Sequence, residues 1–209
     1  MTQLPPLPRR VARGLLEPLL LAALPAAAKL TVMHGYADYT SALLWRMADT
    51  AGPIAVSWQP DGRSTERQLT LDATPSSANV VLARLTGLFP GKAVAYRVTG
   101  YGDSHAGTLT TQPFWSKAAG ARDLAIAFGS CFFLADSDPV WGGQEYGGGF
   151  GIFDAIAAMK PDLLLWMGDK SCFQKPDEFD PAAMAQRYQR QRTFPPLRKL
   201  LTAAPHPAI

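Results

Sequence analysis

Short apolar segments alternate with clusters of turn residues through residues 29–115, at a spacing of roughly 10 to 13 residues. The segments that fit strands are residues 31–34, 41–47, 54–58, 67–71, 80–85, 93–99 and 106–111. The turns include Ala51-Gly52-Pro53, Pro60-Asp61-Gly62 and Pro90-Gly91, which combine a fixed φ with a residue that tolerates positive φ. Short strands separated by such turns predict a two-sheet β-sandwich.

One turn of this region carries a more specific signal. Leu88-Phe89-Pro90-Gly91 followed by Tyr96 is similar to the tyrosine corner of immunoglobulin and fibronectin type III domains, in which a Tyr hydroxyl ties a strand to the preceding turn. We therefore expect a fibronectin- or immunoglobulin-like sandwich over residues 29–115. Trp45 and Trp58 are expected to pack in its interior, because their rings bury a large area there.

The hydrophobic pattern changes after a linker at residues 113–120. A continuous apolar run at 124–128 is followed by a Gly-rich stretch, by apolar residues at helical spacing and by a second run at 163–167. This order predicts a βαβ unit. The two strands lead into Gly129-Ser130-Cys131 and Gly168-Asp169, and the carboxyl ends of parallel strands meet at one sheet edge. Cys131 and Asp169 are therefore expected to be neighbours.

Two helices are predicted after this unit. Asp180 as N-cap and Pro181 at the first position begin one that continues through Tyr188, and a short one runs from Pro195 to Leu200. Residues 204–209 then read as the beginning of another strand. A lone βαβ unit leaves an apolar edge exposed, so the second domain, residues 116–209, is expected to be incomplete.

Residues 1–28 have the order of an export signal. Arg9-Arg10 precede an apolar run at 14–24 and Ala26-Ala27-Ala28, and the run is too short to span a membrane. Glu17 and Pro18 interrupt the run, which leaves an N-terminal arm as the alternative. A periplasmic or secreted location is expected, with a cytoplasmic one as the alternative.

Composition narrows the functional classes. The 209 residues are 47% hydrophobic and 18% charged, which excludes a disordered chain. The net charge is only +3 and the charged residues are scattered along the chain, so the sequence does not predict a nucleic-acid-binding surface. Two cysteines exclude a disulfide framework. His34 and His105 have no titratable partners in the pattern and are expected at loops or the core edge, so the first domain is expected to be a scaffold.

Three motifs resemble one enzyme family in order and spacing. They are Phe128-Gly129-Ser130-Cys131, Phe153-Asp154-Ala155-Ile156-Ala157 and the stretch from Lys160 to Asp169. Together they resemble the N-terminal portion of the alkaline phosphatase D (PhoD-like) metallophosphatase family, over about residues 31–209. The resemblance implies an α+β chain: a fibronectin-like sandwich, then the first part of an α/β calcineurin-like metallophosphatase domain that stops before the family's W-D-D-H-D motif.

The resemblance also implies a metal centre. In that family the corresponding Cys and Asp bind iron(III) and calcium, which carries over to Cys131 and Asp169. The implied activity is hydrolysis of phosphate mono- or diesters, in which the metals lower the pKa of a water that attacks phosphorus. Cys172 replaces the family's Tyr, so it is a further candidate ligand that favours zinc, or a disulfide partner of Cys131, or an inert thiol. Lys170 stands where the family often has Asn.

Several alternatives remain at this stage. The sequence of Gly147–Gly151 fits either a loop that presents backbone amides to a phosphate or an ordinary surface loop. His206 is not a candidate metal ligand. No catalytic or substrate-binding residue is assigned. The whole is expected to be a phosphoric ester hydrolase, inactive as this chain alone because later ligands are missing; a non-catalytic remnant or binding module built on the sandwich is the alternative.

Overall fold

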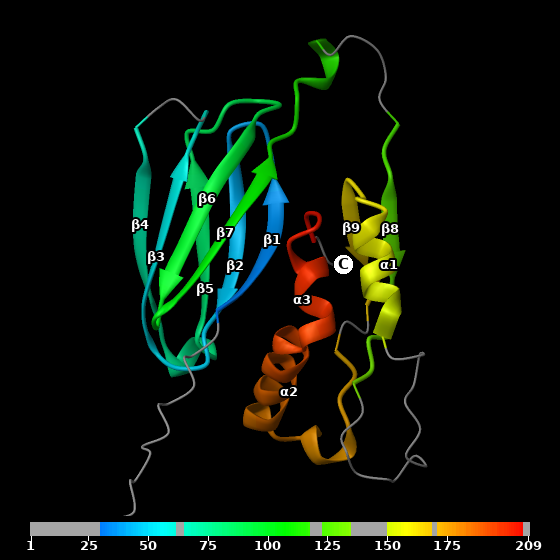
Figure 1. Ribbon diagram of the computed structural model, residues 1–209. Coiled ribbons are helices and arrows are strands. Elements are labelled where there is room, and N and C mark those ends of the chain that lie inside the picture. Colours follow the sequence, from blue (N-terminus) through cyan, green and yellow to red (C-terminus); the bar gives the residue numbers. More distant parts are fainter. Residues whose placement is uncertain (1–29, 62–64, 118–122, 135–149, 169–170, 207–209) are drawn as a thin grey trace, which may run out of the picture.

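The computed structural model describes residues 30–61, 65–117, 123–134, 150–168 and 171–206 (Figure 1). The predicted export segment lies outside the described residues. A β-sandwich forms one side of the molecule, and a second layer of helices and short strands packs against the sheet that contains β1 (Figure 1).

Seven antiparallel strands of the described residues form the sandwich, as two sheets. One sheet has the order β1 (Thr31–Ala37), β2 (Ser41–Met47) and β5 (Val80–Thr86). The other has the order β4 (Arg67–Ala73), β3 (Gly52–Gln59), β6 (Ala93–Gly100) and β7 (Asp103–Thr110). Each strand predicted from the apolar segments is confirmed, with ends that differ by a few residues.

Alternation along each strand sets the sandwich core. On β6, Val94, Tyr96 and Val98 are buried and the residues between them are exposed. These side chains meet the inward residues of β2, among them Leu44, in one apolar cluster that also holds Trp58. The prediction that Trp45 packs inside the sandwich is wrong. Because Leu44 faces inward and strand neighbours alternate, Trp45 faces outward and packs against the second layer.

The second layer begins with the predicted βαβ arrangement. β8 (Ile126–Gly129) and β9 (Leu163–Trp166) pair in parallel, and α1 (Gly151–Ala158) lies between them in the chain. Phe153 of α1 and Trp166 of β9 are buried in a cluster with α3 (Pro195–Leu201). The outer side of β8 stays open to solvent, where Phe128 is 69% exposed, which confirms the expected apolar edge for the described residues.

Helix α2 (Pro181–Thr193) begins where the capping pattern predicts. The Asp180 carboxylate accepts a hydrogen bond from the backbone N–H of Ala182 at 2.9 Å, and Pro181 occupies the first turn. Three short 3₁₀ helices complete the described elements: η1 (Pro75–Ser77), η2 (Trp115–Lys117) and η5 (Lys175–Asp177). None of the helices described is both long and apolar enough to cross a membrane.

The segment at 205–206 joins the two layers. The backbone N–H of Leu164 on β9 donates to the Pro205 carbonyl at 3.0 Å, and the N–H of His206 donates to the His34 carbonyl on β1 at 3.0 Å. The buried His206 ring accepts from the Trp166 indole N–H at Nδ1, 3.0 Å away, so its proton is on Nε2, 2.9 Å from the Leu200 carbonyl. His206 is thus a structural residue. No strand is formed by 204–206, the described part of the predicted strand beginning.

Candidate functional site

Strands β8 and β9 end at the same edge, which is where the sequence places its candidate chemistry. Gly129 pairs with Trp166, and the N–H of Met167 donates to the Gly129 carbonyl at 2.9 Å. Both loops then turn through left-handed residues, at Cys131 (φ 59°) and Gly168 (φ 85°). A left-handed conformation is ordinary for glycine but costs a residue such as Cys131 about 1 kcal/mol, so its loop must be held by other contacts.

The predicted ligands are only partly within the described residues. Cys131 is exposed and Cys172 is half-buried. Asp169 and Lys170 lie outside the described residues, as does most of the Gly147–Gly151 loop. Within the described ranges, no three His, Cys, Asp or Glu side chains gather as a metal site would require. The metal assignment of Cys131, Asp169 and Cys172 therefore stays a prediction, as does pairing of the two cysteines.

A buried glutamine connects the two loops. Gln191 of α2 is 0% exposed, and its Oε1 accepts a hydrogen bond from the Ser171 hydroxyl, in the loop that follows β9. Its Nε2 donates to the Phe132 carbonyl at 3.3 Å, in the loop that follows β8. A second contact joins the loops directly, because the Gln174 amide donates to the Leu134 carbonyl at 3.3 Å.

A buried ion pair holds the later part of the same loop against α2. Arg187 Nε lies 2.8 Å from Asp177 Oδ2, and Arg187 Nη2 donates to Oδ1 at 3.2 Å. The bond from Arg187, with one from the backbone N–H of Gln174, holds the pKa of Asp177 below its usual range. The sequence pattern does not predict this buried polar face of α2. The buried residues of α2 are Arg187, Gln191 and Arg192, and a search for apolar periodicity gives no signal for them.

The sandwich contains a second polar cluster, which corrects two expectations. The Tyr96 hydroxyl shares a hydrogen bond with His34 Nε2 at 2.8 Å and contacts His105 Nε2 at 3.4 Å. The tyrosine-corner prediction is thus wrong for Tyr96, whose hydroxyl contacts these two rings and not the preceding turn. The two histidines are not isolated either. A Cβ at Gly107, opposite Tyr96 on β7, would lie 2.4 Å from the Tyr96 hydroxyl oxygen, so glycine makes room for it.

Burial decides the charge state of this cluster. Desolvation, with a smaller contribution from His105, lowers the pKa of His34 to about 4, so His34 is neutral near pH 7. Desolvation likewise raises the pKa of Tyr96 and lowers that of Arg46 to about 10. The fully buried Arg46 guanidinium has no hydrogen-bond partner in the described part of the chain. The cluster therefore combines a neutral His34 and Tyr96 with a guanidinium that stays protonated near pH 7, and its contacts serve the structure of the sandwich.

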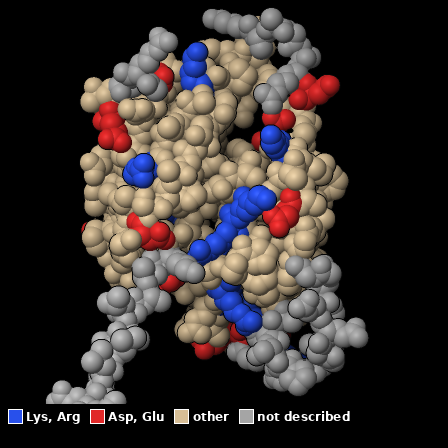
Figure 2. Space-filling view, viewed as in Figure 1, with Lys and Arg blue, Asp and Glu red and all other residues tan. Residues whose placement is uncertain are grey.

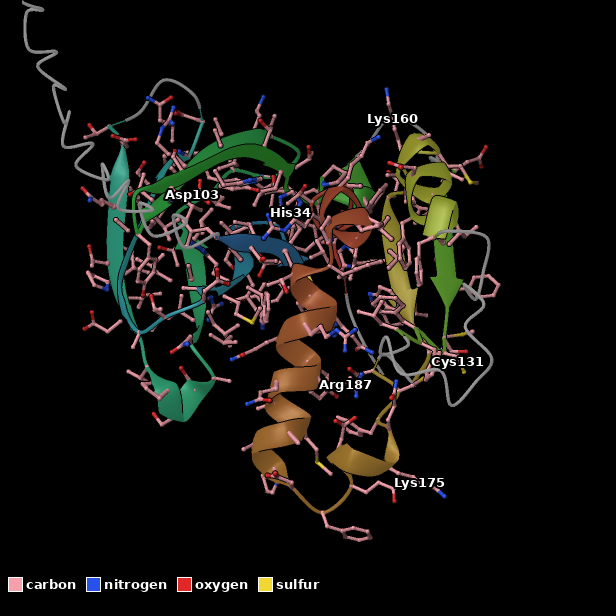
Figure 3. The ribbon with its side chains drawn as sticks, turned by 60° about the horizontal axis from the view of Figure 1, so that its bottom comes forward. His34, Asp103, Cys131, Lys160, Lys175 and Arg187 are labelled. Carbon is pink, nitrogen blue, oxygen red and sulfur yellow. The ribbon has the colours of Figure 1, made fainter. Side chains whose placement is uncertain are left out.

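A cleft of about 410 Å³ lies next to His34, between β1 and the amino ends of β8 and β9. Tyr36 and Trp115 line it, with Leu124 and Asp162 from just before the two strands. Cys131 lies at the opposite end of this layer from Lys160, which precedes β9 (Figure 3). The Asp162 carboxylate already accepts the N–H of Ala125 at 3.0 Å. Because ligands of open α/β sheets bind at the carboxyl ends of strands, the Cys131 edge is the better candidate site.

On the face shown in Figure 2, basic and acidic side chains are interspersed over a mostly uncharged surface. One exposed example is the pair of Lys199 and Asp154, 3.0 Å apart.

No protein-family model matches the chain, and no curated protein sequence matches it. Among solved structures, the fibronectin type III domain of human collagen alpha-1(XX) aligns with 49% of this chain and 98% of its own, with a TM-score of 0.33 and 13% identity. The FN5 domain of Drosophila Lar aligns with 43% of this chain and 98% of its own, with a TM-score of 0.30 and 18% identity.

A longer alignment covers both layers. The structure of PhoD aligns with 86% of this chain at a TM-score of 0.63 and 23% identity. The chain therefore has a PhoD-like fold. It spans 38% of the length of that PhoD chain.

Proposed function

We propose that this chain forms part of a metal-dependent phosphoester hydrolase of the alkaline phosphatase D type. The fold likeness to PhoD and the order of the sequence motifs support the proposal. The observation that carries it is the aligned carboxyl ends of β8 and β9, with the Met167–Gly129 hydrogen bond at their edge. Cys131 follows this edge by two residues on one strand, and Asp169 follows Met167 by two residues on the other.

In this proposal Cys131 and Asp169 are metal ligands and Cys172 is the candidate third. A thiolate together with a carboxylate is a donor set that fits a transition metal beside a hard cation, so iron(III) with calcium fits by ligand type. Ligation by Cys172 would shift the preference toward zinc. Bound ions would supply positive charge opposite the phosphate and a water of lowered pKa. The chain's own residues would fix the positions of the ligands.

The proposed substrate is a phosphate mono- or diester, and the proposed domains are residues 29–115 and 116–209. We also propose export, on the residue order of segment 1–28.

Metal analysis and phosphoester turnover of the full-length protein of which this chain is proposed to form part, measured for wild type and for Asp169→Asn, test the proposal. Wild type is expected to retain iron and calcium after gel filtration and to hydrolyse p-nitrophenyl phosphate or its bis ester. Asp169→Asn should lose metal and activity together. Asp154→Asn is the matched control, since this carboxylate makes an exposed ion pair on α1. Equal metal content and equal turnover in wild type and Asp169→Asn would contradict the proposal; a wild type without either would favour a binding role for the sandwich.

A further inference from the structure

The loops that follow β8 and β9 need something to fix their separation. Among the described residues, the short parallel pairing of β8 and β9 sets the separation of the two strands. The loop after β8 leaves this pairing at Gly129, and the loop after β9 leaves it at Met167. Any site formed by one residue from each loop depends on how far apart the loops are held. The described contacts between them come from polar side chains on α2 and in the loops.

We propose that Gln191 is the positioning residue that sets the spacing between the Cys131 loop and the Cys172 loop. It reaches one residue beyond Cys131, at the Phe132 carbonyl, and one residue before Cys172, at the Ser171 hydroxyl. The effect of Gln191 on metal binding rests on the proposed function. Its role in setting the distance between the two loops does not depend on that function.

Glutamine is suited to this position because its amide has a donor and an acceptor at one end. The Phe132 carbonyl needs a donor, and the Ser171 hydroxyl uses an acceptor. A charged glutamate offers acceptors only and would face the Phe132 carbonyl with repulsion. Methionine keeps the length and the helix propensity but makes neither bond. At a fully buried position, the loss of either partner leaves polar groups unsatisfied.

The helix that carries Gln191 is itself anchored on two sides. Arg187, one turn earlier, is paired with Asp177 of the loop that follows β9. Gln189 faces the sandwich, where its amide donates to the Ala78 carbonyl at 2.9 Å. Helix α2 is therefore held by contacts other than those of Gln191, whereas Gln191 contacts both loops.

The sequence provides a direct probe of the spacing. The chain has two cysteines, one in each loop, so nitroxide labels on Cys131 and Cys172 report the inter-loop distance by electron paramagnetic resonance. Gln191→Met is the test variant. Gln189→Met is the matched control, because it removes a similar glutamine-to-carbonyl bond from the same helix without touching either loop.

Wild type and Gln189→Met are expected to give a narrow inter-label distance distribution, and Gln191→Met a clearly broader one, in protein that still unfolds cooperatively. If Gln191→Met does not fold, Ser171→Ala removes one of the two bonds from the loop side and should broaden the distribution in the same sense. A distribution as narrow as wild type in the folded variant overturns the proposal.

A metal titration on the unlabelled full-length protein, of which this chain is proposed to form part, separates this inference from the proposed function. The probes are calcium and iron(III) citrate in equilibrium dialysis. Gln191→Met is expected to bind them roughly 10-fold more weakly, as for other residues that orient metal ligands, and Gln189→Met as tightly as wild type. Unchanged affinity in Gln191→Met would overturn the positioning role at the site. If wild type binds neither metal, the proposed function fails, while the label distances still decide the role of Gln191.

Discussion

The buried His34 gives the fold a defined response to acid. Its side chain is 5% exposed, and desolvation lowers its pKa from 6.5 to about 4. In the unfolded chain His34 binds a proton near pH 6.5, so between these two pH values the unfolded state holds more protons than the folded state. Stability is therefore complete above about pH 6.5 and falls as the pH drops toward 4.

The difference between the pKa of His34 in the unfolded chain, 6.5, and its pKa in the folded protein, about 4, corresponds to about 3 kcal/mol of unfolding free energy. His34→Gln removes the titration and keeps a side chain that can hydrogen-bond the Tyr96 hydroxyl. His105, whose pKa burial also lowers, is present in both proteins and cancels to first order.

Urea unfolding followed by tryptophan fluorescence from pH 8 to pH 4 measures the effect. Wild type is expected to lose about 3 kcal/mol more than His34→Gln across this range. Parallel stability curves for the two proteins would refute the reasoning that His34 is buried and neutral in the folded state.

Three further substitutions test other parts of the structure, each by urea unfolding at pH 7. Gly107→Ala should lower the unfolding free energy by about 1–3 kcal/mol, because the new Cβ would push the Tyr96 hydroxyl away from His34. Unchanged stability would contradict the close approach of Gly107 to Tyr96. Arg187→Met should lower the unfolding free energy by about 3–5 kcal/mol, because the buried Asp177 carboxylate loses its ion-pair partner and keeps the backbone N–H of Gln174. A loss below 1 kcal/mol would speak against a buried pair. Arg46→Met should leave stability unchanged or raise it by about 1–3 kcal/mol, since it removes a desolvated charge; a clear loss would reveal a partner for this guanidinium.

The sandwich could be predicted because its information is local. Alternation such as that of Val94, Tyr96 and Val98 and turns such as Pro90-Gly91 act within a few residues, so each strand is recognisable by itself. The face that each side chain takes is less local. Trp45 lies on the outer face because Leu44 fills the core and the second layer covers the outside, which the pattern of one strand does not reveal.

Long-range polar contacts were the part that sequence reasoning missed. His34 and Tyr96 are 62 positions apart, and Gln191 and Phe132 are 59 positions apart. Polar residues on a helix usually face solvent, so the sequence gives no signal that Gln191 lies on the buried face of α2. The shared edge of β8 and β9 was predictable, since parallel pairing follows from two apolar runs and a helix between them. The position of Asp169 at that edge stays a prediction.

The central claim is that the edge that carries Cys131 binds a metal through its thiolate. X-ray absorption at the iron edge of iron-loaded protein tests it most directly, with Cys131→Ser as the comparison. We predict sulfur scattering in the first coordination sphere of wild type and its loss in Cys131→Ser. Iron with only oxygen and nitrogen neighbours in wild type, or the same sulfur signal in both proteins, would contradict the claim.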